Sequence, residues 1–197
     1  AQALKGNRAK PVTIRAARGT YDEKSLHLAF MGGATAEQGQ DIMSGDVLSA
    51  NLNEKRRLQK IEARGNSYLR SMTEGRAAEA HARDMDFFLD GDQQLQQAVG
   101  TGDVRARSLD ADSEAQLNGA SKLTVNFESQ AERSALKEMR TEGRTVLTLG
   151  APKSRANDPR AANKRLTADA VNLFWHSKGK DLERAEASER RLLGLVD

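Results

Sequence analysis

The stretch ARDMDFFLDGDQQLQQAVGTGDV, from Ala82 to Val104, decides the fold of this chain. Large apolar side chains alternate with polar ones at Met85, Phe87 and Leu89, which is the pattern of a β-strand with one buried face. The turn-forming residues DGD follow at 90–92, and a second strand-like segment begins at Leu95. The stretch therefore predicts two antiparallel strands joined by a tight turn, which is a β-hairpin.

The segment after the turn recurs five times along the chain. Each copy starts at a leucine and has a small or apolar residue three positions later. Four copies have a glycine seven positions after the leucine, where a bulge or bend relieves a twisted sheet. The leucines are Leu26, Leu58, Leu95, Leu136 and Leu182; the glycines are Gly33, Gly65, Gly102 and Gly143, and the fifth copy has Glu189 in this place.

An alternating segment of large apolar residues precedes three of these leucines, and the first two copies keep only part of it. Because successive side chains of a strand point to opposite faces, we expect the nine residues of these segments to share one face. They are Met85, Phe87 and Leu89, then Leu123, Val125 and Phe127, then Val171, Leu173 and Trp175.

The five hairpins predict an all-β fold of about ten strands in one elongated antiparallel stack, because a hairpin cannot bury its apolar face alone. We expect a single domain over 1–197 with the repeats between about 12 and 188. The segments 130–140 and 180–193 are rich in good helix formers, but the repeat outweighs propensity. We expect little helix outside 130–137.

These units resemble the OstA-like repeat of the periplasmic lipopolysaccharide-transport proteins of Gram-negative bacteria. The motifs that carry the resemblance are LQKIEARGN at 58–66, LQQAVGTGDV at 95–104 and RLTAD at 165–169, and the resemblance covers almost the whole chain. It implies a folded-over, V-shaped β-jelly roll. It also implies a non-enzymatic periplasmic carrier that binds the acyl chains of lipopolysaccharide and passes it from the inner to the outer membrane. Such units are expected to dock end to end, with other OstA-like transport proteins or with a second copy of the chain.

The nine apolar residues have two interpretations. In an open V-shaped sheet they line a groove, where each buried acyl CH₂ stabilises binding by about 0.8 kcal/mol. In a closed sandwich they are ordinary core, and the alternative function is a structural or protein-binding β-module of the cell envelope with no lipid ligand. The basic segment 153–165 offers candidate contacts to lipid phosphates, or is a mobile solvated loop. Its candidate head-group residues are Arg155, Arg160, Lys164 and Arg165.

Composition and motifs favour a binding protein over an enzyme. The 197 residues contain no cysteine, which excludes disulfides and Cys-ligated metal sites, and 38% hydrophobic with 4% aromatic residues suits a thin, elongated fold. The net charge is only +3 and no aromatics interleave the basic segment, so no nucleic-acid partner is expected. The histidines are isolated, the acidic residues at 110–114 lack EF-hand spacing, and no G-x-S-x-G motif occurs. We therefore expect no catalytic residue, no metal and no cofactor.

The last expectations concern the cellular location of the protein and the two edges of its sheet. The resemblance implies a periplasmic location, with or without a membrane anchor in the full-length protein, and any signal peptide was removed or never existed. At the N-terminal edge, Val12, Ile14 and Ala16 alternate with few charges, so we expect this edge to accept a partner strand. At the C-terminal edge, Glu189 is followed by two arginines, and charges discourage such pairing.

Overall fold

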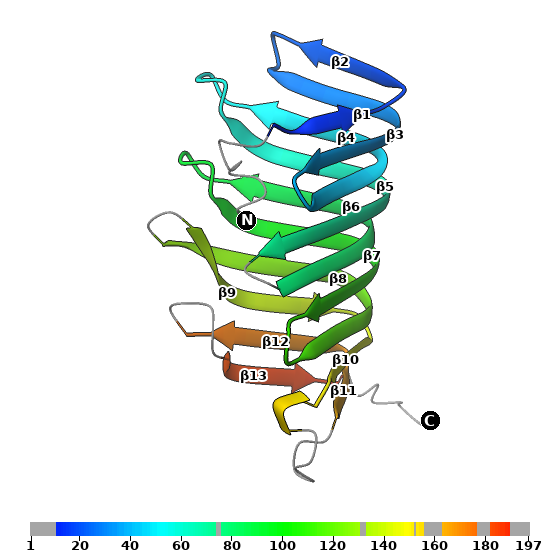
Figure 1. Ribbon diagram of the computed structural model, residues 1–197, viewed down its shortest axis with the longest axis vertical. Helices are drawn as coiled ribbons and strands as arrows, with labels where there is room; N and C mark the ends of the chain where they lie inside the picture. The colour runs from blue at the N-terminus through cyan, green and yellow to red at the C-terminus, as the bar shows by residue number, and fades with distance from the viewer. Residues whose placement is uncertain are drawn as a thin grey trace, which may run out of the picture.

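The computed structural model describes residues 11–73, 76–130, 133–151, 153–155, 163–176 and 182–189, and these form thirteen strands of one antiparallel sheet and one short 3-10 helix. The all-β prediction is confirmed, and Figure 1 shows the strands stacked from the N-terminal to the C-terminal end. The elements are β1 (Thr13–Arg15), β2 (Arg18–Asp22), β3 (His27–Gln38), β4 (Asp41–Leu52), β5 (Leu58–Thr73), β6 (Arg76–Leu89), β7 (Leu95–Leu109), β8 (Glu114–Gln130), β9 (Arg133–Glu142), β10 (Thr145–Leu149), η1 (Lys153–Arg155), β11 (Lys164–Ala168), β12 (Ala170–Trp175) and β13 (Leu182–Ser188).

The described strands occupy ten successive positions across the antiparallel sheet, and we call each position a track. Strands β3 to β8 each fill one track and pair with their neighbours in chain order. Three tracks consist of two short strands each: β1 with β2, β9 with β10, and β11 with β12, and β13 forms the last track alone. The expectation of about ten strands corresponds to these tracks.

Glycines bend the long strands near their middle, as the repeat predicts. The pairing register of β5 with β6 shifts between Arg64 and Ser67, and Gly65 between them has a φ of 70°. The same shift occurs in β7 at Gly102, whose φ is 81°. Glycine adopts this left-handed conformation without the steric penalty that a Cβ brings, so the chain can turn sharply here while pairing continues on both sides.

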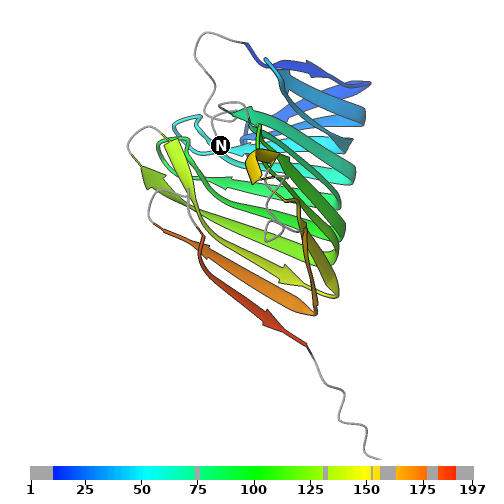
Figure 2. The same ribbon diagram turned by 60° about the horizontal axis from the view of Figure 1, so that its bottom comes forward.

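The bend divides the sheet into two arms (Figure 2). Arm 1 contains β2, β9, β12, β13 and the segments 27–31, 47–52, 58–64, 84–89, 95–101 and 122–130; arm 2 contains β1, β10, β11 and the segments 34–38, 41–45, 67–73, 76–82, 104–109 and 114–118. Buried residues of both arms belong to one apolar cluster, for example Phe87 and Leu123 of arm 1 with Met43, Leu117 and Leu147 of arm 2. The two arms therefore fold over and share a core, which is the V-shaped jelly roll that the resemblance implies.

The sequence analysis allowed for a helix at 130–137. This expectation is wrong for the residues of the segment that the structure describes. Gln130 ends β8, and β9 is already a strand at Arg133. Leu136 pairs with Phe127 of β8, and Ala135 is buried. Pairing and burial along β8 outweigh the helix propensity of this Ala- and Glu-rich segment, because propensity is a weak preference beside tertiary packing.

The two ends of the sheet differ. At the N-terminal end, β1 and β2 pair only with β3 among the described residues, and Val12 and Ile14 are 55% and 41% exposed. At the other end, β13 pairs only with β12 in arm 1, while β11 pairs only with β10 in arm 2. The C-terminal end of the described sheet is thus stepped, since arm 1 extends one strand further than arm 2. Glu189 is exposed, and the two arginines after it lie outside the described residues.

Candidate functional site

All nine apolar residues singled out by alternation lie in arm 1 and point to its inner face. One row of paired residues crosses five strands, from Phe87 through Ala98, Val125 and Met139 to Leu173. Eight of the nine belong to the shared apolar cluster or pack against it, and Leu89, also buried, is the exception. The prediction of a common face therefore agrees with the register.

Burial of these side chains decreases with distance from the bend. Along β12, Val171 is 1% exposed, Leu173 is 7% exposed, and Trp175 is only partly buried. Along β8, Leu123 is buried, whereas Val125 and Phe127 are partly buried. The interior is therefore closed near the bend and opens toward the turns along β8 and β12, whereas Leu89 and Leu95 beside the turn between β6 and β7 are still buried.

The opposite wall of the interior, on arm 2, combines leucines with small side chains. A paired row runs from Leu69 through Ala80 and Ala106 to Leu117 and Leu147. Ala34, Ala82 and Ala168 near the bend are almost fully buried. Sequence analysis did not identify this wall. The alternation of alanine with polar residues at 78–82 is one signal of it, and alanine gives less contrast in such a pattern than a large apolar side chain.

The outer face of arm 1 is ion-paired. Lys60 Nζ lies 2.8 Å from both Glu62 Oε1 and Asp86 Oδ1, and Arg64 Nη2 lies 2.7 Å from Asp86 Oδ1 and also pairs with Glu62. Partial burial disfavours the charge of Asp86, but its hydrogen bonds to Arg64 and Lys60 outweigh this and lower the pKa of the carboxyl. The hydrogen bond to Asp86 in turn raises the pKa of Arg64. The two faces of arm 1 thus have opposite chemistry, apolar inside and charged outside.

The predicted head-group residues fall at the edge of arm 2. Lys164 and Arg165 lie at the start of β11 and are exposed. The side chain of Arg155 and the whole of Arg160 lie outside the described residues. The start of the basic segment is anchored: the backbone N–H of Ser154 donates to Asp112 Oδ1 at 2.6 Å, and its hydroxyl donates to Asp112 Oδ2 at 2.8 Å. Residues 153 and 154 are therefore exposed to solvent and at the same time hydrogen-bonded to the turn between β7 and β8.

The residues considered for metal binding are engaged in local structure. The carboxylate of Asp110 accepts the backbone N–H groups of Asp112 and Ser113 and so shapes the turn between β7 and β8. The ring of His81 stacks on Tyr68 with centroids 4.7 Å apart. Within the described ranges, no group of three His, Asp or Glu side chains is arranged to hold a metal ion. In the same ranges, no helix is long and apolar enough to cross a membrane.

Comparison with known proteins places these features in a family. The family model of the LptA/(LptD N-terminal domain) LPS transport proteins matches residues 13–131, which is more than half of the chain. The chain belongs to this family. The matched region runs from β1 into the end of β8, so it contains six of the long bent strands and the glycine bends between the arms.

A solved structure with a similar fold is that of LptH from Pseudomonas aeruginosa, described as the LptA-homologous periplasmic component of the conserved lipopolysaccharide transport device. The two chains are 15% identical, with a TM-score of 0.50, and the match covers 82% of this chain and 97% of LptH. At this identity the likeness concerns the fold. A search of the curated proteins found no match.

Proposed function

We propose that this chain is a non-enzymatic, periplasmic component of the lipopolysaccharide-transport bridge, and that its apolar interior holds the acyl chains of lipopolysaccharide. Family membership supports the transport role, and the inner face of arm 1 supports the ligand. The observation that carries the proposal is the gradient of burial, because the partly buried Val125, Phe127 and Trp175 offer apolar surface where the interior opens. Burying five methylenes there would stabilise binding by about 4 kcal/mol.

The deeper residues make a different contribution. Met85 and Val171 are only 3% and 1% exposed, so with the arms in this position they are core. This burial fits both candidates, the lipid carrier and a structural module with a filled interior. Acyl chains would reach these residues only if the arms separate, whereas the residues near the turns are accessible without such a change. The test must therefore compare residues near the turns with residues on the outer face.

Photo-crosslinking can separate the two candidates. A photoreactive residue at Phe127 or Trp175 should label lipopolysaccharide. One at Asn126 or Asn172 should not, because these residues of the same two strands point to the outer face of arm 1. A third probe at Phe87 reports whether the deeper interior opens. Equal labelling of both faces, or no labelling at all, would favour the structural module.

We further propose that Lys164 and Arg165 contact the phosphates of the ligand, since both are exposed cations at the edge of arm 2. Replacing both by glutamine should weaken binding of lipid A more than binding of its dephosphorylated form. Equal loss for the two lipids would contradict the assignment.

The N-terminal edge is the proposed docking site for the next unit of the bridge, either another transport protein with an edge strand or a second copy of this chain. The support is that among the described residues β1 pairs only with β3, and that Ile14 of β1 and Val12 just before it are exposed. Ile14→Pro should weaken association, measured by light scattering, while circular dichroism melting checks that the remaining sheet is intact. If Ile14→Pro has no effect and removal of residues 189–197 abolishes association, docking uses the opposite end.

A further inference from the structure

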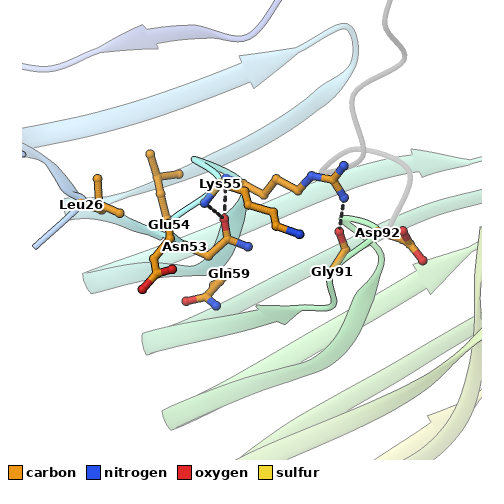
Figure 3. A pocket seen from close by; sticks show the side chains of 9 residues that line it. Leu26, Asn53, Glu54, Lys55, Gln59, Gly91 and Asp92 are labelled. Atoms are coloured by element: carbon orange, nitrogen blue, oxygen red, sulfur yellow. Dashed lines mark hydrogen bonds between the residues drawn. The ribbon is translucent and has the colours of Figure 1, made fainter.

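A pocket of about 680 Å³ lies at the tip of arm 1, between residues of three successive hairpin turns (Figure 3). Leu26 comes from the turn between β2 and β3, Leu52 and Asn53 from the end of β4, and Asp92 from the turn between β6 and β7. The volume is in the range of small-molecule sites. We call this feature the rim pocket.

The rim pocket continues the inner face of arm 1. Ile61 packs against the apolar cluster and pairs with Ala50. Toward the turn the register shifts after Asn51, so that Leu52 pairs with Leu58 and Gln59 lies at this β-bulge beside them. The pocket therefore begins where the apolar interior ends.

Hydrogen bonds between the turns hold the walls of the rim pocket in place. Asn53 Oδ1 accepts the backbone N–H groups of Lys55 and Arg57 at 3.0 and 2.9 Å. Arg57 Nη1 then donates to the carbonyl of Gly91 in the next hairpin at 2.6 Å (Figure 3). The side chain of Gln93 makes two further bonds to the backbone of Leu58, at 3.2 and 2.9 Å. A wall fixed in this way loses little conformational entropy when a ligand binds.

The polar groups of the rim pocket are mixed in kind and balanced in charge. Lys55 and Arg57 supply donors, Glu54 and Asp92 supply acceptors, and the amide of Gln59 supplies both. A compact anion would meet two carboxylates as well as two cations. A ring with several hydroxyl groups, which both donate and accept, matches the whole set, and the leucines provide an apolar surface for its C–H face.

We propose that the rim pocket binds sugar rings of the glycolipid whose acyl chains lie in the interior. This inference rests on the proposed function, because an amphipathic ligand anchored by its chains would leave its sugars at this opening. It assigns the saccharide to the turns of arm 1 and thus to residues remote in sequence from the basic segment.

The test combines Gln59→Ala with Asp92→Ala. Both side chains are exposed, and neither makes a hydrogen bond that contributes to the described structure, since only the backbone N–H of Asp92 is engaged, with Asp90. Gln40→Ala, in the exposed turn between β3 and β4 of arm 2, is the matched control. The probes are lipopolysaccharide, phosphatidylglycerol, which has acyl chains but no sugar, and the soluble oligosaccharide released from lipopolysaccharide.

We expect the double variant to bind lipopolysaccharide about tenfold more weakly, the equivalent of one or two lost hydrogen bonds. Its binding of phosphatidylglycerol should be unchanged, and Gln40→Ala should alter neither. If the double variant binds lipopolysaccharide as well as wild type while Phe127 still labels the lipid, the sugars lie elsewhere and the inference is overturned. If wild type takes up neither lipid yet binds the oligosaccharide in a Gln59-dependent way, the pocket is a sugar site and the carrier function fails. Binding of none of the three probes overturns both.

Discussion

Replacing Gly65 by alanine tests whether the left-handed bend holds the two arms together. Gly65 has a φ of 70°, and an added Cβ would overlap the carboxylate of Asp46 on the neighbouring strand. The conformational penalty of a Cβ at this φ is about 1–2 kcal/mol, and the overlap adds about 1 kcal/mol or more. For a chain of this length we expect the melting temperature to fall by roughly 5–10 °C.

The matched control is Gly91→Ala, because Gly91 lies in an exposed turn, its φ is not left-handed, and a Cβ there meets nothing within 4 Å. Combining Gly65→Ala with Asp46→Ala separates the two causes, since removal of the carboxylate relieves the overlap but not the backbone penalty. Circular dichroism melting of the three variants and wild type gives the comparison. If Gly65→Ala and Gly91→Ala have the same melting temperature, the bend does not require a residue in the left-handed conformation, and the account of the two arms is wrong.

Three further predictions concern other contacts. Asp112→Ala should leave the sheet intact but expose residues 153–155 to faster hydrogen exchange, because it removes both side-chain bonds that anchor them; unchanged exchange would show that the anchor is dispensable. The pKa of Asp86 is lowered in the folded state from its ordinary value of 3.8, so its contribution to stability is complete above about pH 5 and is lost as the pH falls further; Asp86→Asn should flatten the pH dependence of the unfolding free energy below about pH 5, and an unaltered slope would contradict this. Thr141→Val should cost about 1–3 kcal/mol of unfolding free energy, because the hydroxyl accepts the buried N–H of Val171 at 2.9 Å; Thr124→Val, on the outer face of β8, should cost much less in the same denaturant titration.

The candidate site was partly predictable. The inward-facing residues of arm 1 are large, so their alternation with polar neighbours is visible at Met85, Phe87 and Leu89 without any structure. The facing wall on arm 2 contains many alanines, whose small side chains give a weaker apolar pattern than the large residues of arm 1. The rim pocket had no signal at all, because Leu26, Gln59 and Asp92 come from three turns and become neighbours only when the hairpins stack.

The sequence by itself determined the local features of this protein. Period-two alternation specifies strands with one apolar face, and the glycine at the seventh position of the repeat specifies where they bend, because both depend only on neighbouring residues and backbone sterics. Only the tertiary structure decided how deeply each apolar side chain is buried. Val171 and Trp175 belong to the same alternating segment, yet the first is 1% exposed and the second is partly open. Their difference depends on the distance from the bend and on the alanine wall of arm 2, and both are contacts between residues far apart in the chain.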